Sequence, residues 1–363
     1  MTDDAAAVVL ARTVELAAVP APPLDEADRA AVVARWWRTD GLRPQVDRVG
    51  NIVARIRTGE GPATFVAAHL DTVFGRDIPH GTEQRDGRLY GIGVGDNTVA
   101  VAALSLLDRL LPKDLSRPVW IAATTAEEGL GNLAGALHLV GHPPAGMGVL
   151  IALEGNYLGR VATVGVGSIR WLLELEGPGG HSWEAADAPS AIHDLARIIV
   201  SLEGLLPGAR ARARSSLNVG QIEGGESINA RARRAALRTD IRSADPTVLV
   251  DLDSAARRVV DSGTQLATTY KELGKRPAGS IAETHPLVAA ADAALAAVGI
   301  DPEHVAASTD ANAAYAAGIP AVTIGITFGS GEHTPGEWIE TEPIGTGLAA
   351  LADTIVRYDR KAG

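Results

Sequence analysis

Short apolar runs of strand length alternate with helical segments along most of this chain. Two helices are expected near the start, at Asp3 to Ala18 and Asp25 to Thr39, and a long apolar helix at Val99 to Leu111. The runs of strand length are Asn51 to Ile56, Thr64 to Ala68, Val119 to Ala123 and Val149 to Leu153. Strands and helices that alternate at these lengths are typical of a doubly wound α/β sheet.

The pattern changes near Gly165, where polar and apolar residues begin to alternate with the period of a half-buried strand. Two helices follow, at Ala191 to Leu205 and Pro246 to Ser262, each set between strand-like runs. This β-α-β-β-α-β order predicts a small α+β sandwich inserted as a lid. The α/β pattern resumes after about Arg276. The sequence therefore predicts a mixed α/β domain split into residues 1–165 and 277–363, with the inserted domain at 166–276.

Charge and composition exclude several classes of protein. The chain has 363 residues, with 33 Lys and Arg against 44 Asp and Glu, a formal net charge of -11 and no cysteine. An acidic chain is a poor partner for nucleic acid, because that affinity comes largely from Lys and Arg. Without cysteine, any metal must be bound by His, Asp and Glu. No run has the length and apolarity of a membrane span, and the first residues lack the pattern of a signal peptide, so we expect a cytoplasmic protein.

Side chains that commonly bind metals follow three of the expected strands, at the point where each strand ends. His69 and Asp71 come after the run at Thr64 to Ala68. Glu127 and Glu128 follow the next strand of the expected sheet, and Glu154 follows the run at Val149 to Leu153. The carboxyl ends of parallel strands meet at one edge of the sheet, where ligands bind in open α/β folds. The sequence thus predicts a metal site at this edge.

Two further residues of this kind lie in glycine-rich segments. Asp96 follows Gly91-Ile92-Gly93-Val94-Gly95 and precedes the apolar helix, and His333 follows Gly329-Ser330-Gly331. Singly, Asp96 could be a helix N-cap and Glu127-Glu128 a solvated pair at a helix start. Other chemistries lack their motifs, since the chain has no complete G-x-G-x-x-G, no P-loop, no H-E-x-x-H and no G-x-S-x-G. Metal-assisted hydrolysis is the reaction class that remains.

The chain resembles a known family over nearly its whole length. This is the family of co-catalytic zinc peptidases and deacylases that includes glutamate carboxypeptidase, succinyl-diaminopimelate desuccinylase, acetylornithine deacetylase, aminoacylase and tripeptide aminopeptidase. The motifs that carry the resemblance, in order, are His69-Leu70-Asp71-Thr72-Val73, Gly95-Asp96-Asn97, Thr125-Ala126-Glu127-Glu128-Gly129, Glu154-Gly155, Gly180-His181-Ser182, Gly224-Gly225-Glu226-Ser227-Ile228-Asn229, Asp240-Ile241-Arg242, Thr309-Asp310-Ala311 and Glu332-His333-Thr334.

The resemblance implies a role for each matched residue. Two divalent metal ions are implied, zinc by resemblance, although His and carboxylate ligands also suit cobalt or manganese. Asp71 would fix the ring of His69, and Glu127 would be the general base that moves a proton from water to the leaving amine. The ligands implied are His69 and Glu154 for one ion, Glu128 and His333 for the other, and Asp96 as the bridge between them.

The inserted domain carries further residues that the resemblance assigns. His181 would stabilise the oxyanion of a partner subunit's site in a homodimer formed through the lid. Asn229 and Arg242 match positions that bind the substrate's terminal carboxylate, a task that suits the two-pronged guanidinium group of Arg. Arg242 could equally be a strand residue paired with Asp240 or Asp245.

Two substrate classes remain open. Glu154 at the fourth ligand position resembles the carboxypeptidases and deacylases, which favours an N-acyl amino acid or a short peptide with a free C-terminal carboxylate. The segment around Asp310, taken as a substrate-binding residue, looks like the tripeptide aminopeptidases, which favours removal of N-terminal residues. A reading of another class is a catalytically silent, peptide-binding relative. The presence of Glu127 beside every ligand position disfavours it, because a binding protein needs no proton acceptor there.

Overall fold

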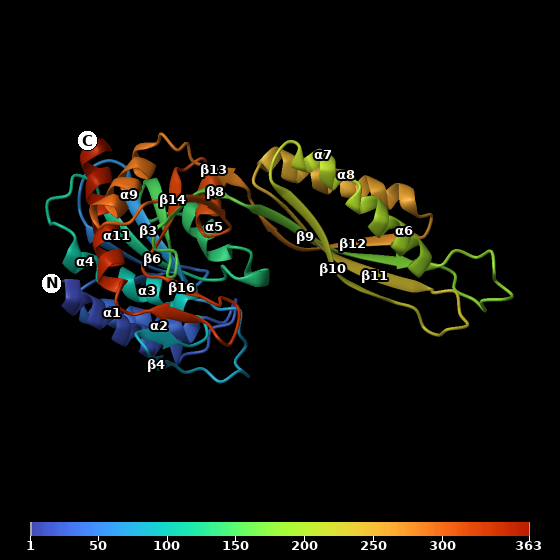
Figure 1. The fold of residues 1–363 in the computed structure, drawn as a ribbon, viewed down its shortest axis with the longest axis horizontal. Helices are drawn as coiled ribbons and strands as arrows, with labels where there is room; N and C mark the ends of the chain where they lie inside the picture. Colours follow the sequence, from blue (N-terminus) through green and yellow to red (C-terminus); the bar gives the residue numbers. More distant parts are fainter. Residues whose placement is uncertain (1, 363) are drawn as a thin grey trace. The chain divides into compact units, whose positions relative to one another are not determined.

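The structure, a computed structural model, describes residues 2–362 and divides into two compact units (Figure 1). The first unit consists of the residues up to Gly165 together with those from Ser280 onward, and the second unit is Val166–Gly279. None of the helices in residues 2–362 has the length and apolar character that a membrane span requires.

A mixed sheet forms the centre of the first unit. Its middle strands run parallel, while β2 pairs antiparallel with β6 and β8 pairs antiparallel with β15. The strands follow the order β1 (Gln45–Val46), β2 (Ile52–Arg57), β6 (Val119–Thr124), β3 (Ala63–His69), β7 (Met147–Glu154), β15 (Ala321–Gly325), β8 (Arg160–Gly165) and β13 (Gly279–Ser280), and β14 (Glu303–Ala307) pairs with β8.

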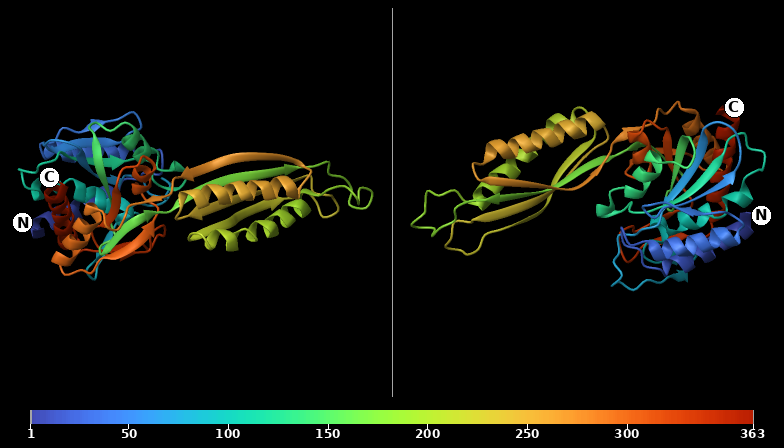
Figure 2. Two further views of the ribbon diagram at one scale, coloured as in Figure 1. Left: turned by 90° about the horizontal axis from the view of Figure 1, so that it is seen from above. Right: turned by 180° about the vertical axis from the view of Figure 1, so that it is seen from behind.

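Helices cover both faces of this sheet, because alternate residues of its buried strands point to opposite sides (Figure 2). Val66 and Ala68 belong to one apolar cluster, whereas Phe65 and Ala67 belong to another. The first cluster includes residues of α1 (Thr2–Ala17), α2 (Ala27–Thr39), α3 (Val99–Leu104), α4 (Leu107–Leu110), α9 (Pro286–Ala297) and α11 (Ile344–Ala362). The second cluster includes residues of α5 (Ala134–Gly141) and α10 (Ala311–Ala316).

The helix expected at Val99 to Leu111 is interrupted. The structure has α3 at Val99–Leu104 and α4 at Leu107–Leu110, with a break at Ser105. The Ser105 hydroxyl donates a hydrogen bond to the carbonyl of Ala102, a local bond that competes with continuation of a helix. The sequence does not predict this break, because the apolar residues continue from Val99 to Leu111 without interruption apart from Ser105, Asp108 and Arg109.

A small antiparallel sheet lies beside the main one and links distant parts of the first unit. Its strands follow the order β16 (Gly329–Ser330), β17 (Trp338–Glu340), β5 (Arg88–Tyr90) and β4 (Glu83–Arg85). It therefore joins the segment that leads to Asp96 to the segment that contains His333.

The second unit is a four-stranded antiparallel sheet with helices on one face (Figures 1 and 2). Ile169, Trp171 and Leu173 point from the sheet into a core shared with the helices. The strands follow the order β10 (Ser215–Gly224), β11 (Arg234–Ser243), β9 (Gly167–Glu176) and β12 (Ala267–Arg276), and the helices are α6 (Ala191–Glu203), α7 (Leu206–Arg210) and α8 (Pro246–Gly263).

Candidate metal centre

Three strands of the main sheet end side by side and deliver acidic and imidazole side chains to one edge. β3 ends at His69, which lies opposite Thr124 at the end of β6, and β7 ends at Glu154. Glu127 and Glu128 follow β6 after a short turn. His69 and Glu154 belong to strands that are buried along most of their length. The hydrophobic core therefore fixes the positions of these two residues.

Five side chains converge at this edge, with Asp96 at the centre. One carboxylate oxygen of Asp96 lies 3.0 Å from Nε2 of His69, and the other lies 3.2 Å from Nε2 of His333. The same His69 nitrogen lies 3.8 Å from Oε2 of Glu154, and the His333 nitrogen lies 3.1 Å from Oε1 of Glu128. Asp96 therefore lies between two pairs of side chains, His69 with Glu154 and His333 with Glu128.

The ligand atoms of these residues are close enough to surround metal ions. In each of two groups, the atoms lie within 4.8 Å of one another: His69, Asp96 and Glu154 form one, and Asp96, Glu128 and His333 form the other. Imidazole nitrogen and carboxylate oxygen are ligands that zinc and similar divalent ions accept. The donor set and its spacing thus fit two ions that share Asp96.

Charge at the cluster supports the same reading. Burial would raise the pKa of the Asp96 carboxyl, but the rings of His333 and His69 hold it below its usual range. Burial raises the pKa of Glu154 to about 7, although His69 opposes the shift. Hydrogen bonds to Asp96 and Glu128 raise the pKa of His333 to about 10. The acidic groups that gather at this edge contribute to the raised pKa values of Glu154 and His333, and a divalent cation bound there could balance their charge.

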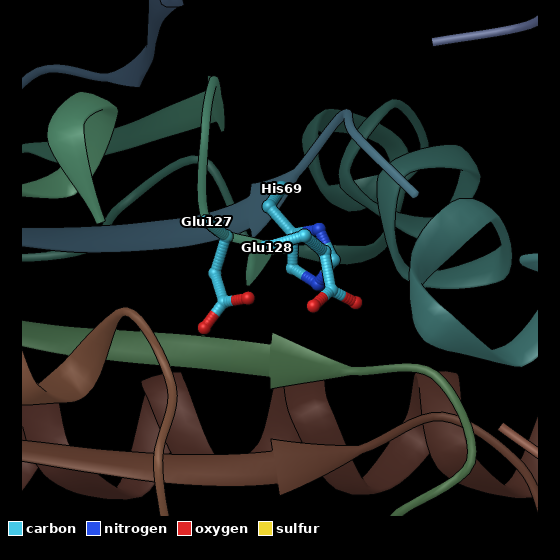
Figure 3. Close-up of side chains that lie close together, drawn as sticks. All are labelled: His69, Glu127 and Glu128. Carbon is cyan, nitrogen blue, oxygen red and sulfur yellow. The ribbon is translucent and has the colours of Figure 1, made fainter. Parts of the chain in front are cut away.

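Glu127 lies beside the cluster. His69, Glu127 and Glu128 form a third group whose oxygen and nitrogen atoms lie within 4.8 Å of one another. Figure 3 shows the two glutamate side chains leaving adjacent positions of the loop and extending to the same side as the His69 ring. The Glu127 side chain is buried, with the residue only 4% exposed. A carboxylate in this position can exchange protons with a molecule held at the cluster.

Asp71 binds the backbone that carries the two glutamates. Its two carboxylate oxygens accept the N–H groups of Glu127, at 3.0 Å, and Glu128, at 2.7 Å. Nδ1 of His69 lies 3.1 Å from the backbone carbonyl oxygen of Asp71 and 3.4 Å from its carboxylate. The residue thus contacts the His69 ring through two oxygens, the nearer of which is the carbonyl rather than the expected carboxylate.

Sequence reasoning missed two other side chains that hold the same loop. The N–H of Thr125 donates to Oδ1 of Asn51 at 2.9 Å, and the N–H of Ala126 donates to Oε1 of Glu26 at 2.9 Å. Together with Asp71, these acceptors bind four consecutive backbone N–H groups, from Thr125 to Glu128. Neither Asn51 nor Glu26 lies in a motif that marks such a role.

Glu337 plays the corresponding part for Asp96, and it was also missed. Its fully buried carboxylate accepts the N–H groups of Gly93 at 2.7 Å, Gly95 at 2.7 Å and Asp96 at 2.8 Å. Gly93 has a φ of 66°, a left-handed conformation that favours glycine. Burial raises the pKa of Glu337 to about 7 even though these N–H groups oppose the shift.

We expect Glu337→Ala to lower the free energy of unfolding by about 3 kcal/mol, since it leaves three backbone donors without their acceptor. Chemical denaturation of the wild type and the variant measures the difference. Glu340→Ala is a matched control, because Glu340 lies three residues further on and its side chain is 37% exposed. A Glu337→Ala protein as stable as the control would show that the carboxylate does not hold this loop.

Asn97 connects the turn after Asp96 to the strand that ends in Glu154. Its Nδ2 donates to the carbonyl of Leu153 at 2.6 Å, and its Oδ1 accepts the N–H of Gly155 at 2.9 Å. These two bonds flank Glu154 on both sides. They fix the spacing between two residues of the cluster that lie far apart in the sequence.

The remaining predicted site residues lie outside this cluster. Asp310 is in the first unit, only 3% exposed, and its Oδ2 accepts the hydroxyl of Thr124 at 2.5 Å. His181 and Asn229 are exposed residues of the second unit in neighbouring segments, since the N–H of Ser182 donates to the carbonyl of Asn229. Arg242, also in the second unit, forms an ion pair with Asp240 at 2.9 Å.

Comparison with known proteins places the chain in a family. The model of peptidase family M20/M25/M40 matches residues 65–357. An acetylornithine deacetylase from Shigella sonnei is 30% identical over 250 residues, which cover 62% of this chain and 63% of that protein. One from Aliivibrio fischeri is 27% identical over 244 residues, with 62% and 63% covered. The chain thus matches just under two thirds, 63%, of the length of these relatives. It belongs to peptidase family M20/M25/M40.

Solved structures show the same fold over nearly the whole chain. Aminopeptidase PepT from Bacillus cereus has a TM-score of 0.80 at 18% identity, with 97% of this chain and 98% of that chain covered. The YxeP protein from Bacillus subtilis, described as a dinuclear metal-binding peptidase, has a TM-score of 0.73 at 17% identity, with 98% of each chain covered. Both the predicted family and the predicted mixed α/β fold are confirmed.

Proposed function

We propose that this protein is a metal-dependent hydrolase that cleaves an amide bond in a small substrate. The observation that supports this most is the position of Asp96, whose two oxygens face His69 and His333 while Glu127 lies buried beside the same group of atoms. A carboxylate placed to bridge two ions, as Asp96 is, beside a second carboxylate that binds no metal, as Glu127 is proposed to be, suits hydrolysis assisted by two metal ions.

In this proposal, His69 and Glu154 would hold one divalent ion, and Glu128 and His333 would hold the other. Asp96 would be shared between them. Zinc is the expected metal, and cobalt or manganese would suit the same ligands. When bound, the ions supply Lewis acidity, which makes water a better nucleophile and polarises the amide carbonyl.

Glu127 then performs the proton transfers. Its carboxylate takes a proton from the attacking water and later gives that proton to the nitrogen of the leaving amine. The hydrogen bond from its backbone N–H to Asp71 holds it at the cluster. Its burial keeps competing water away from the carboxylate.

We propose that His181 stabilises the oxyanion formed at the amide carbon, across a homodimer formed through the second unit. The N–H of Trp183 lies 3.3 Å from Nδ1 of His181, so that nitrogen accepts a hydrogen bond. The ring proton is then on Nε2, where it can be donated to an anion.

For His181→Ala, we expect kcat to fall by about 10²-fold while the fold and the metal content stay unchanged. Steady-state kinetics and circular dichroism measure both. His142→Ala is a suitable control, because His142 is an exposed histidine outside the matched motifs. Unchanged kcat in His181→Ala would remove this residue from the reaction.

For the substrate, we propose an N-acyl amino acid or a short peptide with a free C-terminal carboxylate, bound in part by Asn229 and Arg242. Support comes from the sequence similarity to acetylornithine deacetylases. The alternative is a di- or tripeptide aminopeptidase, which the fold similarity to PepT and to a Staphylococcus aureus tripeptidase keeps open. Asp310 is the third residue that we propose to bind substrate; it lies in the first unit and is 3% exposed. The protein is proposed to act in the cytoplasm.

A screen of purified protein tests the proposal. N-acetyl amino acids, dipeptides and tripeptides are compared with zinc or cobalt added, and with a chelator as control. We expect hydrolysis of at least one class, lost with the chelator and restored by metal. Tight metal binding without hydrolysis of any amide would instead favour a catalytically silent relative that binds peptides.

A further inference from the structure

The beginning of α2 is hydrogen-bonded to the segments that carry His69, Asp96 and Glu127. Glu26 immediately precedes this helix and is 5% exposed, and Arg29 lies in its first turn and is fully buried. Both residues precede residue 65, where the match to the family model begins. Charged side chains buried this deeply are costly to desolvate unless they make specific hydrogen bonds.

Glu26 makes such bonds to the loop that carries Glu127. Its Oε1 accepts the N–H of Ala126 at 2.9 Å and the N–H of Leu24 at 2.8 Å. Ala126 has a φ of 54°, a left-handed conformation that costs a residue with a Cβ about 1 kcal/mol or more. The surrounding hydrogen bonds must hold that conformation, and it sets the direction in which the chain enters Glu127.

Arg29 links two other parts of the cluster from the same helical turn. One terminal nitrogen donates to the carbonyl of Leu70 at 3.0 Å and to the hydroxyl of Thr98 at 3.2 Å. Leu70 follows His69 directly, and Thr98 lies two residues after Asp96. Glu26 and Arg29 together are thus bonded to the three segments that carry His69, Asp96 and Glu127.

We infer that Glu26 is a positioning residue, which acts through the Ala126 amide to hold the Glu127 carboxylate in the orientation needed for proton transfer. This inference rests on the proposed role of Glu127. Glu26 reaches the general base only through Ala126, the residue that precedes Glu127, and we place no proton exchange with substrate on Glu26 itself. It adds to the site a residue that no ligand or catalytic motif marks.

Substitutions of different length test the inference. Glu26→Asp keeps the charge but shortens the side chain by one methylene, which withdraws the oxygen from Ala126. Glu26→Gln loses the charge but keeps a carbonyl oxygen at the same distance. We expect Glu26→Asp and Glu26→Ala to lower kcat by about 10-fold with KM and metal content unchanged, and Glu26→Gln to keep most of kcat.

The control is Asp25→Asn, since Asp25 is the preceding residue, is exposed and pairs with Arg76 at the surface. It is expected to leave kcat unchanged. If Glu26→Ala does not fold, the comparison of Glu26→Asp with Glu26→Gln still decides the question. Equal kcat values for these two variants would overturn the inference. The inference requires kcat to depend on the position of the oxygen that accepts the Ala126 N–H, and that position differs between Asp and Gln.

A double-mutant cycle separates positioning from general loosening of the fold. In a Glu127→Gln background, Glu26→Asp should have no further effect on kcat, because the group that it positions is gone. A further 10-fold loss in that background would overturn the inference. If Glu127→Gln alone leaves turnover unchanged, the proposed role of Glu127 fails, because another group then moves the proton. If Glu127→Gln lowers turnover and Glu26→Asp does not, only the role of Glu26 fails.

Discussion

Replacing Glu127 by Gln is expected to lower turnover by about 10²- to 10⁴-fold while the protein keeps its full metal content. The amide of Gln has nearly the shape of the carboxylate but cannot accept the proton of the attacking water. Glu127 belongs to a group with His69 and Glu128 but to neither group that contains Asp96, so its loss leaves the ligands of the two proposed ions in place. Steady-state kinetics and elemental analysis measure the two quantities.

Glu60→Gln provides the control for Glu127→Gln, because Glu60 is an exposed residue in a turn of the same unit. It should have wild-type turnover. Near-wild-type turnover in Glu127→Gln would show that another group moves the proton. Loss of metal in that variant would instead make Glu127 a ligand.

The second large effect is expected for Asp96→Ala, which should lose both metal ions and all measurable hydrolysis. Asp96 has one oxygen near His69 and the other near His333, so its removal takes a ligand from both proposed ions at once. His333→Ala should remove a ligand from one ion only. The metal content per chain, measured after dialysis, is therefore expected to fall to about zero in Asp96→Ala and to about one in His333→Ala.

Asp301→Ala is the matched control for Asp96→Ala, since Asp301 is an exposed aspartate of the same unit. It should retain both ions. If Asp96→Ala retained two ions per chain, the bridge would be wrong and each ion would need its own complete set of ligands.

Residues at the ends of buried strands could be predicted from the sequence. His69 and Glu154 follow apolar runs of strand length. Because ligands gather at the carboxyl edge of such a sheet, the sequence predicts that these two side chains lie close together. His333 lies after a short glycine-rich segment instead, and its role came from the family resemblance. The residues around His333 show no strand or helix pattern that would place this side chain, because His333 has a φ of 61° and lies in no helix or strand.

The residues that hold the cluster in place could not be predicted in this way. Glu26 and Ala126 are 100 residues apart, and Glu337 and Asp96 are 241 apart, so no local pattern relates them. Glu26 and Glu337 are both buried carboxylates that accept backbone N–H groups. The sequence does not distinguish such a carboxylate from an exposed one. A side chain that binds backbone leaves no signature at the partner position, because every residue except proline offers an N–H.

The most direct test of the account is anomalous X-ray scattering at the zinc edge from crystals grown with zinc. The account predicts two peaks per chain, about 3.5–4 Å apart, with Asp96 in contact with both. One peak should lie against His69 and Glu154, and the other against Glu128 and His333. Zinc bound elsewhere, with no peak among these five side chains, would contradict it.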